Sequence, residues 1–457
     1  MRKSMEVQDF IDSLPLSALQ RTILWLCFFV VAVDGFDTAA VGFIAPAIRE
    51  EWHLSAAALA PLFGAGLFGL MAGALLFGPL ADRLGRKTIL VWSVGFFGLA
   101  SLASATAPDL GWLIVLRFLT GMGLGGAMPN AITLTSEYSP LARRSRLVTL
   151  MFCGFTIGSA LGGVVSAQLL ALYGWRSILF AGGVMPLLLV PVLVRMLPES
   201  LRFLVLKQRS AKDVQDIVNR LGEVREAPVL TAHEARTNAP VRALFQRDIA
   251  AGTLTLWLSF FMSLLIIYLI SSWMPILLRS TGASLSLASW VTATFQIGGT
   301  VGAILLGRMM DRFGACRVLG TAYLLGAVFV VMCGASVSNL WLLVVAVFGV
   351  GFCVSGSQVG ANALAAAFYP TGNRATGVSW ANAAGRSGSV VGSLCGGWMM
   401  AMHLDISFIL TLLAVPALIA AVAIAVLGRV SARIGTESRD TAAFSDLNGT
   451  PGTVPVK

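Results

Sequence analysis

Charged side chains are scarce in this sequence. They make up 12% of its 457 residues, whereas 57% of the residues are hydrophobic and the mean hydropathy is +0.83. Soluble domains carry about 25% charged residues. This shortage excludes an ordinary soluble globular protein and indicates a chain that lies in a lipid bilayer.

Residues that bind metals or form disulfides are also few. The three histidines, His53, His233 and His403, have no metal-ligand spacing. No CxxC pair occurs among the six cysteines, five of which fall in apolar runs, so neither a zinc site nor a disulfide framework is expected. The chain also has no nucleophile–base arrangement and no nucleotide-binding loop. We therefore expect no enzyme, no metal and no bound cofactor.

Long apolar runs are what the sequence has instead. We count twelve segments of about 18–28 residues, against about 20 residues needed for one bilayer crossing. The first lacks a signal-peptide cleavage site, so we expect it to be a retained span. The approximate limits of the twelve are 22–44, 57–80, 88–106, 112–136, 148–172, 177–197, 251–278, 288–307, 318–335, 340–366, 377–400 and 408–427.

A polar, basic segment divides these spans into six plus six. We expect an all-α integral membrane protein with 12 transmembrane helices in two pseudo-symmetric six-helix bundles. The composition of the last part, from residue 431 onward, predicts disorder. The expected parts are an N-terminal tail (1–21), an N-terminal bundle (22–197), a central loop (198–250), a C-terminal bundle (251–428) and a C-terminal tail (429–457).

Lysine and arginine are distributed unequally between the two sides of the membrane. Of the 32, we assign 27 to one side, three to the other (Arg49, Arg176 and Arg279) and two to the spans (Arg117 and Arg386). The positive-inside rule then places both termini and the central loop in the cytoplasm, with the chain in the cell inner (plasma) membrane. The net charge of +10 is thereby explained without a nucleic-acid partner.

The two halves of the chain repeat. Residues 78–85 (GPLADRLG) recur as 307–314 (GRMMDRFG), an offset of 229, and a Pro followed by Arg144 recurs before Arg374, an offset of 230. Internal duplication of a six-span unit indicates a secondary transporter with its site between the halves.

Two acids and two arginines fall inside the spans. Asp34 and Asp37 share nearly one helix face, and a charge at that depth costs on the order of 2.5–3.5 kcal/mol. At ~1.5 Å per residue, Asp34, Arg117 and Arg386 all lie ~18–20 Å from the cytoplasmic edge. Charges from both halves at one depth indicate a midplane site. A structural ion pair plus one interfacial carboxylate is the alternative.

Several motifs resemble those of the major facilitator superfamily. Residues 78–87 (GPLADRLGRK) closely match its loop 2–3 motif, Arg117-x3-Gly121-x3-Gly125 resembles its fourth-span motif, and residues 198–202 (PESLR) resemble the motif after its sixth span. In the fifth span, Ser159 stands where drug/proton antiporters of the superfamily carry proline, which weakens an antiporter interpretation.

Three further segments resemble one group within that superfamily, the aromatic acid:proton symporters, which include the 4-hydroxybenzoate/protocatechuate transporters. These segments are 34–37 (DGFD), 121–130 (GMGLGGAMPN) and 374–377 (RATG). The resemblance implies a monomer that takes up a small aromatic acid anion with H+ by alternating access, the proton being the coupling ion.

Roles can be assigned from this resemblance and from side-chain chemistry. A guanidinium matches a carboxylate bidentately, which makes Arg386 the expected substrate ligand, unless it pairs with backbone carbonyls or with Asp34. Arg117 is expected to hold Asp34 or Asp37, and either acid can carry the proton. Further substrate contacts are expected from amide and aromatic side chains, with ordinary packing as the alternative: Gln296, Gln358, Trp273, Trp380 and Asn362.

The resemblance also implies that charges at the cytoplasmic loop tips clamp the outward-open state. These gate residues are Asp82, Arg83, Arg86, Asp311 and Arg312. Glu137 either joins this gate or is a solvated helix end.

Other functions stay open at this point. A proton-coupled exporter of drugs or of another organic anion belongs to the same class. A membrane sensor would need a signalling domain, and the central loop and the tail are too small for one. The sequence chooses neither the ring substituents of the substrate nor the number of protons.

Overall fold

The computed structural model describes residues 4–208, 211–222, 229–231, 241–246, 249–369 and 374–447, with no side chain described at Ser4, Ser145, Val229, Arg374, Ala375 or beyond Ala432. Within these ranges the chain is almost entirely helical, and eleven helices are long and apolar enough to cross a membrane. The predicted all-α class is confirmed.

The first half supplies six long helices. They run close to the predicted limits, and each extends beyond its limits at one end or at both. The Ser17 hydroxyl and the Gln20 side chain form a capping box that starts the first of these helices. The six are α2 (Ala18–Glu51), α3 (Ala60–Leu84, preceded by η1, Ala57–Leu59), α4 (Arg86–Ser104), α5 (Leu110–Glu137), α6 (Leu141–Tyr173) and α7 (Trp175–Met196).

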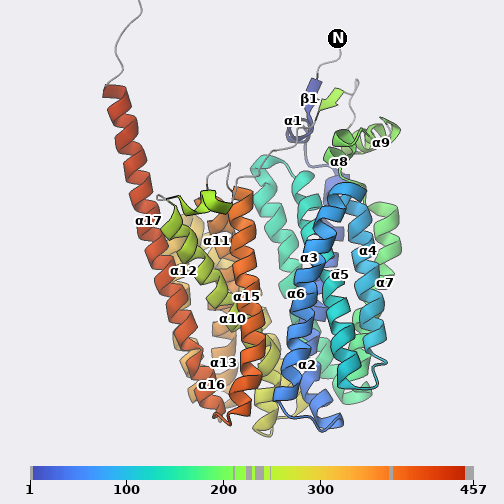
Figure 1. Cartoon of the computed structure of the whole chain (residues 1–457), viewed down its shortest axis with the longest axis vertical. Coiled ribbons are helices and arrows are strands. Elements are labelled where there is room, and N and C mark those ends of the chain that lie inside the picture. Colours follow the sequence, from blue (N-terminus) through green and yellow to red (C-terminus); the bar gives the residue numbers. More distant parts are fainter. Residues whose placement is uncertain are drawn as a thin grey trace, which may run out of the picture.

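The second half supplies six more long helical units. They are α10 (Ala250–Ser280), α11 (Leu285–Phe313), α12 (Ala315–Ala335), α13 (Leu340–Val350) with η3 (Gly351–Ser355) and α14 (Gly356–Phe368), α15 (Arg374–Ala401), and α16 (Ile406–Leu412) with α17 (Ala414–Leu447). Of these, α15 is not among the eleven apolar helices, because glycine, serine and asparagine lower its hydropathy. In Figure 1 the helices of the two halves gather on opposite sides of the molecule.

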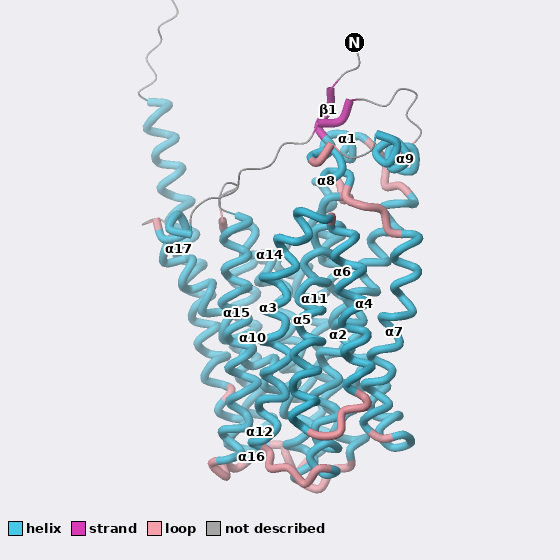
Figure 2. Tube along the Cα trace, turned by 45° about the vertical axis from the view of Figure 1, so that its right-hand side comes forward, coloured by secondary structure: helices cyan, strands magenta, loops and turns pink. Residues whose placement is uncertain are grey.

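The N-terminal segment and the central loop contain structure that the sequence did not predict. A strand β1 (Ser4–Glu6) pairs in parallel with β2 (Val229–Thr231), and a short helix α1 (Val7–Ser13) lies beside them. Helices α8 (Leu201–Leu206) and α9 (Ala211–Leu221) complete this group, which lies at one end of the bundle (Figure 2). The turn η2 (Val241–Phe245) precedes α10.

The expectation of disorder in the C-terminal tail is wrong for its first part. Helix α17 continues through the segment to Leu447, and residues 448–457 lie outside the described residues.

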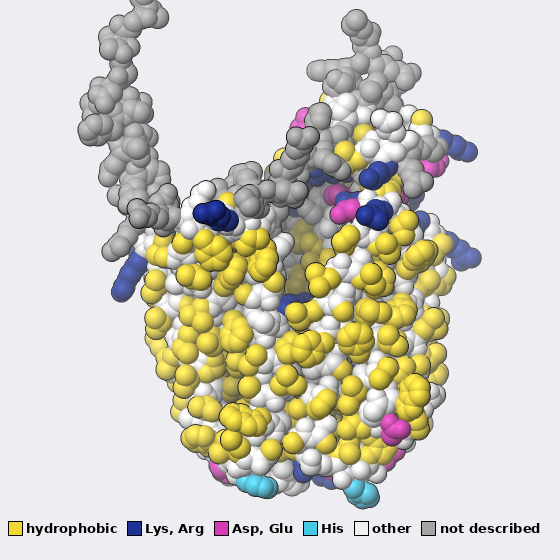
Figure 3. Space-filling view, viewed as in Figure 1, with side chains coloured by type: hydrophobic (Ala, Val, Ile, Leu, Met, Phe, Trp, Pro, Cys, Tyr) yellow, Lys and Arg dark blue, Asp and Glu magenta, His cyan; other side chains and the backbone are white. Residues whose placement is uncertain are grey.

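The two halves touch each other at the end of the bundle away from the N-terminus. A Cβ at Gly42 of α2 would overlap the carbonyl of Ser271 of α10, and a Cβ at Gly163 of α6 would overlap Ala293 of α11. All four lie in the parts of their helices distant from the N-terminal and central segments. At the opposite end a hollow opens between the halves, with a basic side chain at its depth (Figure 3).

Candidate functional site

The two buried acids sit on α2 where α6 packs closely against it. A Cβ at Gly35 would overlap the carbonyl of Phe155, and the Ser159 hydroxyl donates a hydrogen bond to the Gly35 carbonyl at 2.9 Å. Small residues thus let the two backbones approach. Asp34 and Asp37 themselves are 1% and 2% exposed.

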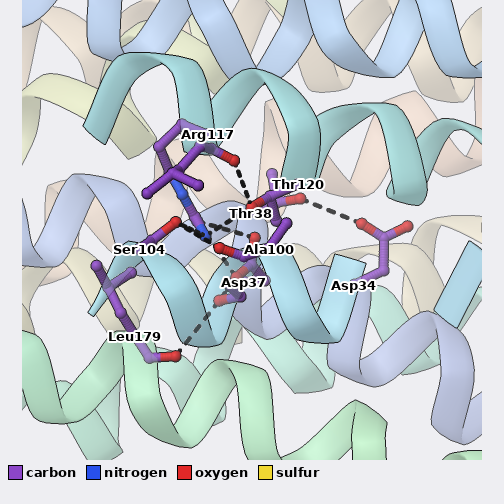
Figure 4. A network of polar contacts seen from close by, with 10 residues as sticks. Asp34, Asp37, Thr38, Ala100, Ser104, Arg117, Thr120 and Leu179 are labelled. Carbon is purple, nitrogen blue, oxygen red and sulfur yellow. Dashed lines mark hydrogen bonds and ion pairs between the residues drawn. The ribbon is translucent and has the colours of Figure 1, made fainter. Parts of the chain in front are cut away.

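Asp37 is fully engaged with a cation and a hydroxyl. Arg117 Nη1 lies 3.1 Å from Asp37 Oδ2 and 3.2 Å from Oδ1, and the Ser101 hydroxyl donates to Oδ1 at 2.8 Å. The other terminal nitrogen of Arg117 donates to Ser104 at 3.3 Å and to Thr120 at 3.0 Å (Figure 4). This is a buried ion pair whose remaining hydrogen-bonding positions are largely satisfied.

Asp34 lies apart from that cluster (Figure 4). The Thr38 hydroxyl donates to its Oδ1 at 3.2 Å, while its Oδ2 is buried without a hydrogen-bond partner. No cation lies within ion-pair distance of it among the described residues, and the guanidinium of Arg386 attracts it over a longer range. Asp34 therefore has an oxygen that is free to bind a proton.

Arg386 stands on α15 at the boundary between the halves. Its Nη1 donates to the Tyr268 hydroxyl of α10 at 3.0 Å, and its Nη2 lies 3.7 Å from the sulfur of Met128 on α5. It is only partly buried, and no described carboxylate forms an ion pair with it. Its charge is thus available to an anion that enters between the halves.

The three predicted amides take different positions. Gln296 of α11 is buried and donates to the Ser271 hydroxyl at 3.2 Å. Gln358 of α14 is buried with its Oε1 unpartnered. Asn362, one turn further, is partly exposed and donates to the Gln358 carbonyl at 3.1 Å.

The two predicted tryptophans are packed against other side chains. Trp273 is fully buried, and its indole N–H donates to the Ser393 carbonyl at 2.7 Å. Its ring meets Phe63 edge to face, which places it in the closed contact between the halves. Trp380 is 43% exposed and stacks on Trp257, about 9 Å along α15 from Arg386. The structure does not bring either ring into contact with Arg386.

Three gate residues of the first half, Asp82, Arg86 and Glu137, come together near the end of α3, whereas the fourth, Arg83, is exposed. Asp82 and Arg86 form an ion pair at 2.8 Å, and Arg86 lies 4.0 Å from Glu137 and over the ring of Phe203. Glu137 is mostly buried and accepts a hydrogen bond from the Ser200 hydroxyl, so it is not a solvated helix end.

The second-half gate residues lie elsewhere. Arg312 on α11 covers the ring of Phe313, next to the exposed Asp311. Within the described ranges no ion pair joins these second-half charges to the first-half cluster. At the other end of the molecule, Glu50 of α2 pairs with Arg279 of α10 across the halves.

Comparison with known proteins identifies the family. A family model described as Major Facilitator Superfamily matches residues 27–277 and 256–445. The chain belongs to the major facilitator superfamily. A gallate transporter from Pseudomonas putida is 48% identical over 94% of this chain and 96% of its own length. A 4-hydroxybenzoate transporter from Pseudomonas aeruginosa is 46% identical over 93% and 96%.

The predicted membership is thus confirmed, as is the narrower resemblance to transporters of aromatic acids. The fold has a solved counterpart in the xylose transporter of E. coli, in a partially occluded inward-open conformation, with a TM-score of 0.70. That structure shares 18% sequence identity and matches over 89% of this chain and 97% of its own, so the likeness concerns the fold alone.

Sequence reasoning missed the hydroxyl groups that complete this transporter's buried ion pair. Thr120 follows Arg117 by three residues, so its place on the same helix face was readable. Ser101 and Ser104 lie on α4, and nothing in their sequence spacing connects them with Asp37 or Arg117.

Proposed function

We propose that this chain is a proton-coupled symporter that carries a hydroxylated aromatic carboxylate across the inner (plasma) membrane. The 4-hydroxybenzoate, protocatechuate and gallate anions are substrates of this kind. Two observations together carry the proposal. Arg386 is a cation without a carboxylate partner among the described residues, and Asp34 is a buried acid with one oxygen that accepts no hydrogen bond. The names of the relatives support the substrate class.

Arg386 and Asp34 couple the two transported species. The Arg386 guanidinium attracts the Asp34 carboxylate in the empty site. A substrate anion bound at Arg386 offsets that attraction, so proton binding at Asp34 and anion binding at Arg386 reinforce each other. Asp37 and Arg117 stay paired and hold α2 against α4 and α5. The activity is transport rather than catalysis, by a monomer in the lipid bilayer with no nucleic acid involved.

The arrangement of the halves supports alternating access. With both termini and the central loop in the cytoplasm, the hollow opens inward and the Glu50–Arg279 pair lies at the outer end. The two bundles, 22–197 and 251–428, rock about the central site. When the cytoplasmic ends close, the first-half gate charges Asp82, Arg83, Arg86 and Glu137 approach Asp311 and Arg312.

Uptake by proteoliposomes tests this function. We expect labelled 4-hydroxybenzoate to accumulate when the outside is acidic, and a protonophore to abolish the accumulation. Arg386→Ala should remove uptake, because a bidentate charge partner of the carboxylate is lost. Absence of uptake for every aromatic acid of a panel, with export of another organic anion instead, would contradict the proposal.

A further inference from the structure

Among the described residues, two buried side-chain oxygens that can act only as hydrogen-bond acceptors have no donor near them. They are Asp34 Oδ2 and Gln358 Oε1. The remaining buried side-chain atoms without partners in those ranges are hydroxyls or N–H groups. Buried acceptors are satisfied in most folded proteins, so each exception needs a reason. The role proposed for Asp34 as the proton site accounts for the first oxygen, whereas Gln358 Oε1 has no hydrogen-bond donor among the described residues.

The packing of α14 shows which way Gln358 faces. Gly356 lies against Gly302 of α11, and Gly360 lies against Met310 and the next helix. At 3.6 residues per turn, Gln358 lies about 200° around the helix from Gly356. Its face is therefore turned away from α11.

The internal repeat gives the same orientation independently. An offset of 230 relates Gln358 to Met128, whose sulfur contacts Arg386. Since the halves are duplicated units, positions that contact the central charges in one half have counterparts facing the centre in the other. The packing of α14 and this equivalence together assign Gln358 to the face of α14 that looks toward the centre between the halves.

A local distortion precedes this position. Residues Gly351–Ser355 form a π-helical turn directly before α14. Such turns inside α-helices are frequent at functional sites, because they rotate the following residues out of the regular register.

We propose that Gln358 Oε1 accepts a hydrogen bond from a hydroxyl on the substrate ring, so that the site selects ring-hydroxylated acids over benzoate. This inference rests on the proposed function and names the residue that recognises the ring hydroxyl. The carboxylate end binds Arg386 and Tyr268, whose hydroxyl accepts from Arg386 and keeps its own proton for the ligand. A site with a buried acceptor rejects an analogue without the donor, whereas a purely apolar pocket discriminates weakly.

The test compares uptake efficiency for labelled 4-hydroxybenzoate and labelled benzoate in proteoliposomes. We expect the unaltered protein to prefer 4-hydroxybenzoate at least tenfold, and Gln358→Leu to remove most of that preference by lowering 4-hydroxybenzoate uptake with benzoate uptake retained. Ser357→Ala is the matched control, since its neighbouring hydroxyl is also buried and unpartnered but lies on another face. It should leave the preference unchanged.

A ligand series gives an answer without any variant. In competition against 4-hydroxybenzoate uptake, 4-aminobenzoate retains a donor at the same ring position, and 4-methoxybenzoate offers none. We expect the amino compound to compete at least tenfold better than the methoxy compound. Equal competition by the two compounds would overturn the inference, and so would a Gln358→Leu variant that lowers the uptake of 4-hydroxybenzoate and of benzoate by the same factor. In either case, uptake of 4-hydroxybenzoate by the unaltered protein still supports the transport function. A protein that takes up no aromatic acid overturns both.

Discussion

At the scale of single residues, two acids one helical turn apart have different environments. Asp37 has an arginine and a serine as partners, whereas Asp34 has one threonine and an open oxygen. This difference supports the proposal that Asp37 belongs to a structural ion pair and that Asp34 binds the proton.

The stability of variants should follow this difference. Asp37→Asn leaves the Arg117 charge buried without its counter-ion, and breaking a buried pair costs about 3–5 kcal/mol. Asp34→Asn breaks no ion pair and should lower the free energy of unfolding by less than about 1.5 kcal/mol. Unfolding in detergent measures both. Equal losses in the two variants would show that Asp34 is held as firmly as Asp37.

The sequence predicted the site's charges but not their pairing. It placed Asp34, Arg117 and Arg386 in one membrane layer, because depth follows from helix rise alone. It left open which acid Arg117 holds. The rotation of the helices and the position of the α4 serines are known only from the folded structure. The tryptophans illustrate the same limit. Trp273 is an aromatic residue of the kind that could contact a substrate ring, but its ring packs between the halves instead.

At the scale of elements, the acid-bearing helix α2 is positioned by its contact with α6. The glycines of α6 allow this contact, as the overlap of a Cβ at Gly158 with the Ala32 carbonyl indicates. The long apolar runs predicted these helices well. The strands β1 and β2 were not predicted, because three-residue strands have no measurable periodicity.

Adding a methyl group to α6 should separate the two helices. Gly158→Ala forces α2 away, and overpacking of this kind costs about 1–3 kcal/mol or more. Gly78→Ala is the control, because a Cβ there meets nothing within 4 Å and a helical alanine is favoured over glycine by about 0.5–1 kcal/mol. Thermal unfolding should show a loss for the first variant and no loss for the second; the reverse order would contradict the packing described.

At the scale of the whole molecule, the halves are joined at the end that carries the Glu50–Arg279 pair and parted at the end that carries the N-terminal and central segments. The Glu50–Arg279 pair crosses the joined end, yet both side chains are more than a third exposed. Exposed pairs contribute about 0–1 kcal/mol, so this pair marks the closed end rather than holding it shut.

Cross-linking across this pair should stop the transport cycle. Cysteines that replace Glu50 and Arg279, joined by a short thiol cross-linker, fix the outer end closed. We expect uptake to cease and to return when a cleavable linker is reduced. The control variant carries cysteine in place of Glu51 and Arg279, because Glu51 pairs with Arg176 of its own half instead. Full uptake by the cross-linked protein would contradict the assigned outer gate.

The most direct test of the central claim separates substrate movement from proton coupling in Asp34→Asn. Proteoliposomes loaded with unlabelled 4-hydroxybenzoate report exchange, which needs no net proton transfer. Empty proteoliposomes under a pH gradient report coupled accumulation. Because the variant keeps Arg386 but has no proton site, it should exchange within a few-fold of the unaltered protein and accumulate nothing. Accumulation that follows the pH gradient in Asp34→Asn would contradict the account.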